Sequence, residues 1–206
     1  DENQITQEKV NIVYELEQKL IEILLLYGNN EEEFEDVLLK VNEEGDTIEV
    51  VEKNNYKVHQ RIYLSLQEDE IELANPIFKE LYNDLISKYN LSEDFNREHY
   101  FQQLSPDFAQ IVTDILMQDE KEVLHNWEAK HIYVKNKNTT ISQYVSETII
   151  SFREYLINKL IVDLMKSFTP ESQENELEEI KTTINDYNKL KVILTNKIGR
   201  IRSTYY

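Results

Sequence analysis

The scarcity of glycine and proline constrains the fold of this chain more than any other feature. Only three glycines and three prolines occur among 206 residues, and every proline follows a side chain that can cap a helix, in the pairs Asn75-Pro76, Ser105-Pro106 and Thr169-Pro170. An oxygen-bearing N-cap residue accepts a hydrogen bond from a free amide of the first helical turn, and proline at the next position removes another free amide. The sequence therefore predicts an all-α fold in which the three pairs mark helix starts.

Apolar periodicity indicates where the other helices lie. The first helix is predicted from about Thr6 to Tyr27, with Gly28 as its C-cap. Further helices are predicted near residues 55–67, 76–89, 95–103, 106–117 and 120–130. Residues 29–53 are the least readable part: the pattern favours a short helix over Phe34–Val41, and TIEVV suits either a brief strand or an extended segment. A sheet is not expected.

The last third of the chain has the most regular pattern. From Ile141 to Lys166 apolar residues recur every three or four positions, and extra apolar residues widen the stripe, so this long helix is expected to bury more than one side. A second long helix is predicted from Pro170, after a turn at Phe168-Thr169. Its heptad seam has one row at Leu177, Ile184, Lys191 and Ile198 and another at Ile180, Tyr187, Leu194 and Ile201. We expect a multi-helix bundle over 1–140, followed by a long helical hairpin over 141–206.

Charge and composition exclude several classes of function. The formal net charge of −18 repels a nucleic-acid backbone, so direct nucleic-acid binding is not expected. The segment 181–206 differs, because it carries six basic residues and one acid. The chain has no cysteine, which fits a reducing cytoplasmic setting, and no apolar run long enough to span a membrane. Its start at DENQITQEK, without methionine, suits an excised fragment of a longer protein.

The stretch HNWEAKH is the most suggestive of catalytic chemistry. His125, Glu128 and His131 recur at every third position, and on a helix they could share one broad face. The two histidines are nevertheless about 9 Å apart along a helix axis, whereas zinc-binding helices place histidines four residues apart. We interpret Trp127 as a buried anchor, and we expect no metal and no cofactor. The chain also lacks a glycine-rich phosphate loop, a GxSxG elbow and a cysteine nucleophile, so no catalytic residue is expected.

Several stretches together resemble a known family. EILLLYGNN, NPIFKELYNDLI, LHNWEAKHIYV, the long helix that follows, and the terminal pair Gly199-Arg200 are similar in order and spacing to the C-terminal, helicase-binding domain of DnaG-type bacterial DNA primases, in particular the longer versions of Bacteroidetes. The resemblance covers most of the chain and is weakest over residues 29–60. It implies a helical bundle followed by a helical hairpin, without the zinc-binding and catalytic domains of a primase.

The resemblance also implies partners and a site. The partners would be the N-terminal region of the hexameric, DnaB-type replicative helicase and the rest of the primase chain. We expect the helicase contact on the final helix, whose candidate residues combine apolar and basic side chains: Tyr187, Leu190, Lys191, Ile193, Leu194, Lys197, Ile198, Arg200 and Arg202. Some of these residues must instead pack within the hairpin. Two alternatives remain, namely a helical adaptor or coiled-coil oligomerisation module, and a metal-dependent helical hydrolase that uses His125, Glu128 and His131.

Overall fold

The structure is a computed structural model that describes residues 11–41, 47–91, 95–129, 141–167 and 174–203. Within these ranges the side chains of 37–40, 47, 49, 118–129, 174–176 and 198–203 are not described. The described elements are α1 (Ile12–Tyr27), β1 (Glu31–Val41), β2 (Thr47–Lys57), α2 (Val58–Glu68), α3 (Pro76–Leu91), α4 (Arg97–Gln103), α5 (Pro106–Ala129), α6 (Ile141–Lys166) and α7 (Glu174–Ser203).

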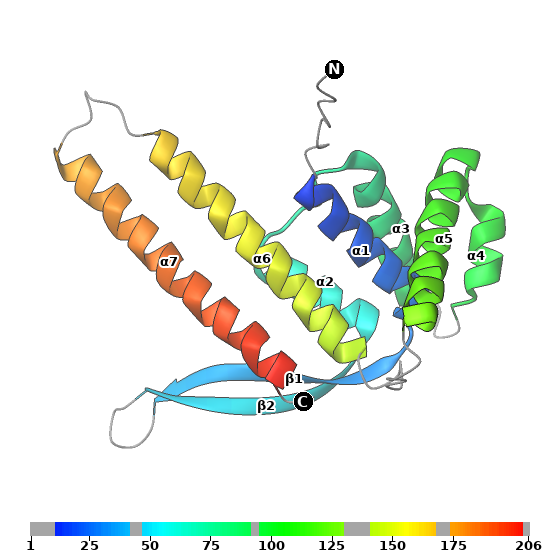
Figure 1. Ribbon diagram of the computed structural model, residues 1–206, viewed down its shortest axis with the longest axis horizontal. Helices are drawn as coiled ribbons and strands as arrows, with labels where there is room; N and C mark the ends of the chain where they lie inside the picture. Colours follow the sequence, from blue (N-terminus) through cyan, green and yellow to red (C-terminus); the bar gives the residue numbers. More distant parts are fainter. Residues whose placement is uncertain (1–10, 42–46, 92–94, 130–140, 168–173, 204–206) are drawn as a thin grey trace.

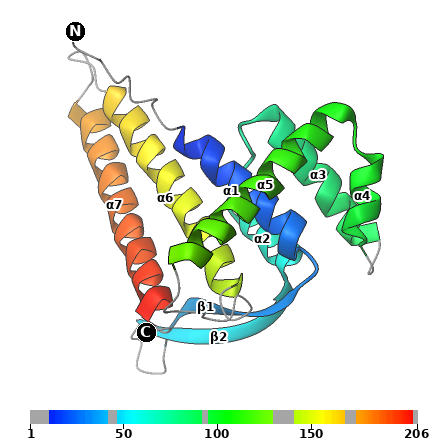
Figure 2. The same ribbon diagram turned by 45° about the vertical axis from the view of Figure 1, so that its right-hand side comes forward.

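The described residues are mostly helical, and they divide into a body and a long hairpin. Helices α1 to α5 form the body, and α6 lies between this body and α7 (Figures 1 and 2). The expected long helix over 141–166 is confirmed, whereas the two helices expected at 106–117 and 120–130 are one continuous helix, α5. The turn at Phe168-Thr169 and the start at Pro170 lie outside the described residues.

The all-α prediction is wrong over residues 31–57. The segment for which the sequence favoured a short helix is strand β1, and it pairs in antiparallel register with β2, from Glu31 opposite Lys57 to Val41 opposite Thr47. Pairing decides the outcome, because β2 is rich in β-branched residues and because Lys53 makes ion pairs to Glu33 at 2.8 Å and Glu35 at 3.1 Å across the strands. The acidic run that favoured a helix thus finds its partner on the neighbouring strand.

Phe34 and Asp36 of the β ribbon contact the body. Phe34 is buried in the core, and Arg61 of α2 lies over its ring at 5.5 Å while it also makes two hydrogen bonds to Asp36 at 2.6 and 3.0 Å. Farther along the ribbon, Val41 and Val51 are more than half exposed. The ribbon runs beneath the lower ends of α6 and α7 (Figures 1 and 2).

The helix boundaries follow local capping chemistry. Gly28 is the C-cap of α1, as expected, but its backbone is right-handed, so its φ and ψ do not require glycine. A Cβ at this position would collide with the Tyr89 hydroxyl, which donates a hydrogen bond to the Leu24 carbonyl. Glycine is therefore needed here for close approach. Asn11 caps the N-terminus of α1, which begins at Ile12 in the described residues rather than at Thr6.

Two of the three predicted proline starts are confirmed. The Asn75 side chain accepts from the amides of Ile77 and Phe78 at 2.9 and 3.3 Å, and Ser105 accepts from the Phe108 amide at 3.5 Å. The pair Thr169-Pro170 lies outside the described residues. Capping side chains therefore fix where α3 and α5 begin.

The apolar core lies where α1 meets α2, α3 and α6. It contains Leu20, Ile21 and Leu24 of α1, each with no exposed surface. Helix α6 contributes Val145, Ile149 and Phe152 to this same core. Tyr144, Tyr155 and Leu156 pack against it, so the contacts of α6 with the core lie between Ile141 and Leu156.

Candidate docking surface on the C-terminal hairpin

Helices α6 and α7 pack antiparallel in a register that polar contacts define. Lys191 donates to the Asn158 side chain at 2.8 Å, and Thr195 donates to Glu154 at 2.7 Å. Both contacts join α7 to one side of α6, one helical turn apart on each helix. The stretch of α7 around residues 191–195 therefore lies beside residues 154–158 of α6.

The hairpin has its own small apolar core. Ile150 and Ile157 of α6 and Leu194 of α7 are buried together, and Ile161 and Tyr187 pack against them. Of the extra apolar residues that widened the stripe of α6, Ile150, Ile157 and Ile161 pack in the hairpin core, whereas Val145, Ile149 and Phe152 of the main stripe pack in the body. The expectation that α6 buries two sides is confirmed for its first half, whereas Val162 and Met165 are exposed.

The C-terminal part of α7 contacts a charged cluster on the body. The half-buried Lys197 faces Asp36, Arg61, Arg153 and Glu68. Its pKa is lowered, first by burial; the two acidic groups oppose this shift and the two arginines add to it. Arg153 pairs with Asp69 and lies 3.7 Å from Glu68. Positive and negative groups from β1, α2, α6 and α7 therefore meet at this junction.

The structure sorts the nine candidate residues of the final helix. Leu194 and Tyr187 belong to the hairpin core, Lys191 is bound to Asn158, and Lys197 faces the body. Leu190 and Ile193 are exposed, with 43% and 57% of their surface accessible. The side chains of Ile198, Arg200 and Arg202 lie outside the described residues.

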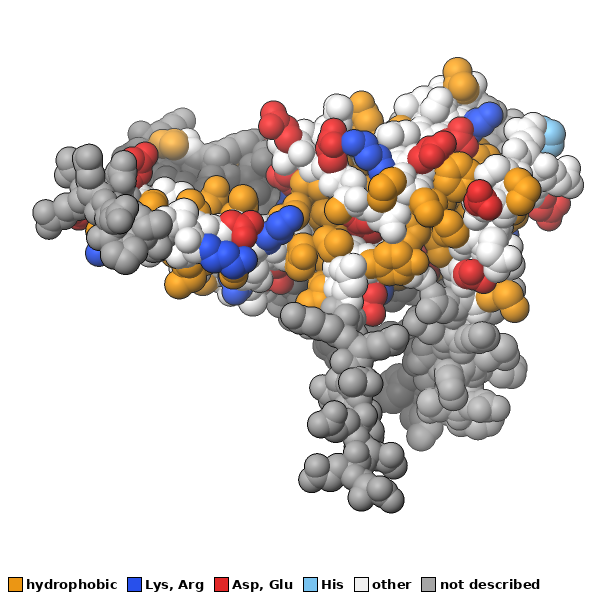
Figure 3. Space-filling model, turned by 90° about the horizontal axis from the view of Figure 1, so that it is seen from above, with side chains coloured by type: hydrophobic (Ala, Val, Ile, Leu, Met, Phe, Trp, Pro, Cys, Tyr) orange, Lys and Arg blue, Asp and Glu red, His pale blue; other side chains and the backbone are white. Residues whose placement is uncertain are grey.

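Sequence reasoning missed four further exposed apolar residues on the hairpin: Val192 of α7 and Leu160, Val162 and Met165 of α6. Helical periodicity assigned Leu160 to the buried stripe, because the pattern does not reveal where α6 leaves the body. Val192 lies between the rows of the heptad seam, and that position could have marked it as exposed. Seen from above in Figure 3, the hairpin carries hydrophobic and basic side chains close together.

We define the docking face as the exposed residues Lys189, Leu190, Val192 and Ile193 of α7. Single exposed apolar residues are ordinary, but three within four positions on a helix beside a lysine resemble an interface. Lys189 makes one ion pair, to Asp186 at 2.9 Å, and both side chains are well exposed. The docking face is therefore apolar at its centre, with one basic side chain at its edge.

No site for a metal ion occurs among the described side chains, which include no group of three or more histidine or acidic residues suitably placed. The side chains of His125, Trp127 and Glu128, and the whole of His131, lie outside the described residues. Within the same part of the chain, no helix is both long and apolar enough to cross a membrane.

Comparison with known proteins places the chain in one family. The family model described as Domain of unknown function (DUF8430) matches residues 4–201. The chain belongs to the DUF8430 family. No curated protein and no solved structure matches the chain. The DUF8430 match spans both the body and the hairpin, so the family unit includes the docking face.

Proposed function

We propose that this chain is a non-catalytic protein-docking domain of a bacterial DNA primase, and that its C-terminal hairpin binds the replicative helicase. The docking face carries the proposal, because it presents apolar side chains to solvent on a helix that already buries Leu194 and packs Tyr187 in the hairpin core. A monomer gains nothing from leaving such residues exposed. The resemblance to primase C-terminal domains names the partner.

The arrangement of the elements supports this role. The hairpin extends away from the body (Figure 1), so its outer part is open to a large partner. The acidic charge of the whole chain agrees with a domain that works near DNA without adhering to it. The β ribbon is a feature that the resemblance did not imply, and it lies at the other end of the hairpin.

The heptad seam argues for a docking hairpin rather than for a coiled-coil oligomer. Leu194 and Tyr187, which would form an intermolecular seam, pack against Ile150 and Ile157 of the same chain. These two seam residues are therefore packed within the chain. Light scattering measures the difference, because the docking domain is expected to be monomeric whereas a coiled-coil module would self-associate.

The first prediction concerns the docking face. Replacing Leu190 or Ile193 with aspartate places a charge at the centre of the proposed interface, and each change is expected to weaken helicase binding at least tenfold. The measurement is fluorescence anisotropy of the labelled chain titrated with the hexameric helicase of the same organism. Both residues are exposed, so the fold should tolerate the changes.

The matched control is Leu91→Asp, which replaces another exposed leucine at the end of α3, on the body. This variant should bind like the unmodified chain. An unmodified chain that fails to bind helicase would overturn the proposed function, and equal losses in all three variants would overturn the choice of surface.

A further inference from the structure

Two hollows lie side by side between α2 and α3, on the body. The first, between the helices and the segment that joins them, has a volume of about 380 Å³, and the second has about 320 Å³. Tyr63 of α2 lines both hollows, so they are adjacent, and we call the two together the groove. The groove follows α3 from Lys79 to Asn90, which corresponds to about 16 Å at a rise of ~1.5 Å per residue.

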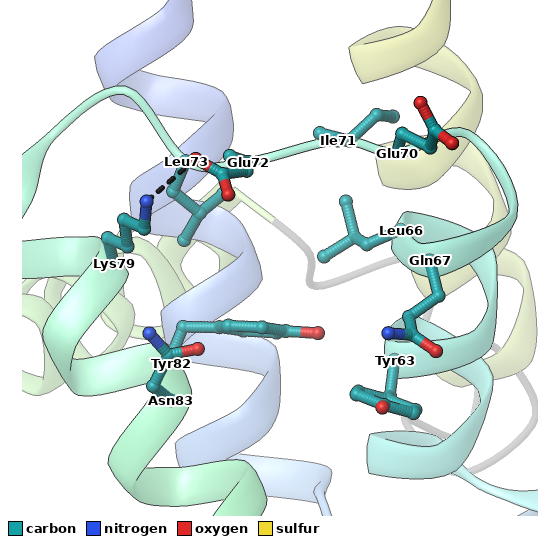
Figure 4. Close-up of a pocket in the computed structure, with 10 residues that line it drawn as sticks. All are labelled: Tyr63, Leu66, Gln67, Glu70, Ile71, Glu72, Leu73, Lys79, Tyr82 and Asn83. Carbon is teal, nitrogen blue, oxygen red and sulfur yellow. Dashed lines mark hydrogen bonds and ion pairs between the residues drawn. The ribbon is translucent and has the colours of Figure 1, made fainter.

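The groove has aromatic walls and carboxamide edges. Tyr82 extends from α3 toward Tyr63 and Gln67 on α2, with Leu66 and Ile71 near the end of its ring (Figure 4). The pKa of Tyr82 is raised, first by burial and then by the nearby Tyr63. Among the described residues, the carboxamides of Gln67, Asn83 and Asn90 make no hydrogen bond to protein and are exposed, so they are available to a ligand.

The rim of the first hollow includes a backbone conformation that is unfavourable for its residue. Glu70 has a φ of 53°, in the left-handed region. It ends α2 in a Schellman turn, with its amide bonded to the Gln67 carbonyl and the Ile71 amide bonded to the Leu66 carbonyl. Glycine is the usual residue at this position. The chain instead places a carboxylate at the rim.

The surroundings of the groove are acidic. Residues 67–84 carry six acidic side chains and one basic side chain, Lys79. Lys79 is engaged by Glu72 at 2.7 Å, and Arg153 of α6 neutralises part of the charge of Glu68 and Asp69. The carboxylate of Glu70 is exposed beside the hollow. A cationic ligand is therefore favoured over an anionic one.

We propose that this groove binds an extended, basic peptide segment of another protein. One apolar or aromatic side chain of the peptide fills the hollow beside Tyr63 and Tyr82, and the carboxamides of Gln67 and Asn83 bond to its backbone. Lysine or arginine side chains on either side of it face Glu70 and Glu72. The inference goes beyond helicase docking, because it concerns a surface of α2 and α3 rather than α7.

Chemistry separates this ligand from the alternatives. A helical ligand satisfies its own backbone groups and has no use for the carboxamides, whereas an extended chain does. Nucleic acid is repelled by the acidic rim. The basic residues of a second copy, Lys181, Lys189, Lys191 and Lys197, lie on a helix that is already packed against α6.

The test is selection from a library of random nonapeptides displayed on phage, with the full chain immobilised. The selected peptides are then synthesised with a fluorescent label, and their affinity is measured by anisotropy. We expect an apolar or aromatic residue flanked by lysine or arginine. The double variant Gln67→Ala/Asn83→Ala should weaken binding about tenfold or more, because it removes the side chains that bond to the peptide backbone. Both positions are exposed, so the fold should tolerate the changes.

Two further variants make the result specific. Glu70→Lys/Glu72→Lys should also weaken binding about tenfold, and this effect should shrink at high salt. The matched control Asn185→Ala/Asn188→Ala removes two exposed carboxamides from α7 and should leave affinity within twofold. The proposal is overturned if no peptide is enriched, if the selected peptides are acidic, or if the groove variants bind normally. A selected sequence that matches residues 181–202 would assign the groove to a second copy and overturn the stated partner.

Discussion

Glu17 shows how one buried charge can fix the position of two helices. Its side chain, on α1, has no exposed surface, and its two oxygens accept hydrogen bonds from the amides of Ala74 and Asn75, the latter at 3.0 Å. These amides immediately precede α3, where the helix dipole also favours a negative charge. The carboxylate therefore accepts hydrogen bonds from amides that have no partner within α3 and would otherwise need water.

Removing this carboxylate should destabilise the body. Glu17→Ala leaves two amides without their acceptor and is expected to lower the free energy of unfolding by about 1–3 kcal/mol. Urea denaturation followed by circular dichroism measures the change. Glu15→Ala, at an exposed position on the same helix, is the control and should stay close to the unmodified chain. Equal stabilities for the two variants would show that the Glu17 contacts contribute nothing.

His59 gives the body a defined dependence on pH. Its ring is buried, stacks on Tyr89 with centroids 4.7 Å apart, and bonds through Nδ1 to the Gly28 carbonyl at 2.8 Å. Its pKa is lowered from 6.5, first by burial; the Gly28 carbonyl opposes this shift and the charge of Lys57 adds to it. The native protein therefore holds this ring neutral where the unfolded chain binds a proton.

The sign of the pH effect follows from that difference. Stability from His59 is fully present above about pH 6.5 and is lost as the pH falls through the lowered native pKa, because the unfolded chain binds more protons in that window. Urea midpoints measured from pH 7.5 to 5 should therefore decrease. His59→Gln should flatten this slope, and a slope that persists in the variant would assign it to other groups.

At the scale of elements, α6 joins two cores that share no residue. Its body-facing residues lie at Val145, Ile149 and Phe152, and its hairpin-facing residues at Ile150 and Ile157. The hairpin core is small, since three residues form its buried part among the side chains that the structure describes. The hairpin should therefore open at a lower free energy than the body.

Leu194→Ala tests this division. The change removes the buried side chain that α7 contributes to the hairpin core, at an expected cost of about 2–4 kcal/mol. Hydrogen exchange read by mass spectrometry should become faster in α7 peptides and stay unchanged in α1 peptides. Leu190→Ala, at the exposed docking face, should exchange like the unmodified chain. Faster exchange throughout the body would show that the two cores unfold together.

For the whole molecule, the sequence predicted where helices begin and end better than it predicted which elements contact one another. The caps at Asn75 and Ser105, the end of the first helix at Gly28, and both ends of α6 followed from side-chain chemistry and periodicity. The β ribbon did not, because glutamate-rich β1 is stabilised by β2 across the ribbon rather than by its own sequence. Glycine at position 45, between two apolar runs, was the available hairpin signal.

The site was harder to predict for a related reason. The heptad pattern correctly placed Leu194 and Tyr187 in a seam, but a seam does not reveal which neighbouring residues a second helix leaves uncovered. Leu190 and Ile193 are neighbours of the core residue Leu194 in the sequence, yet α6 leaves both of them exposed. The α2–α3 groove had no sequence signal, since it depends on the path of residues 69–75 between the two helices.

Helix α6 also has a mechanical consequence. It runs for 26 residues, about 39 Å, without a glycine or proline to act as a hinge. A load applied at the outer end of the hairpin is therefore transmitted along a stiff rod into the centre of the body, where Phe152 and Val145 are held in the core. A partner bound to α7 therefore sets the orientation of the body as well as its location. Torque from that partner reaches the interface between α6 and α1 directly.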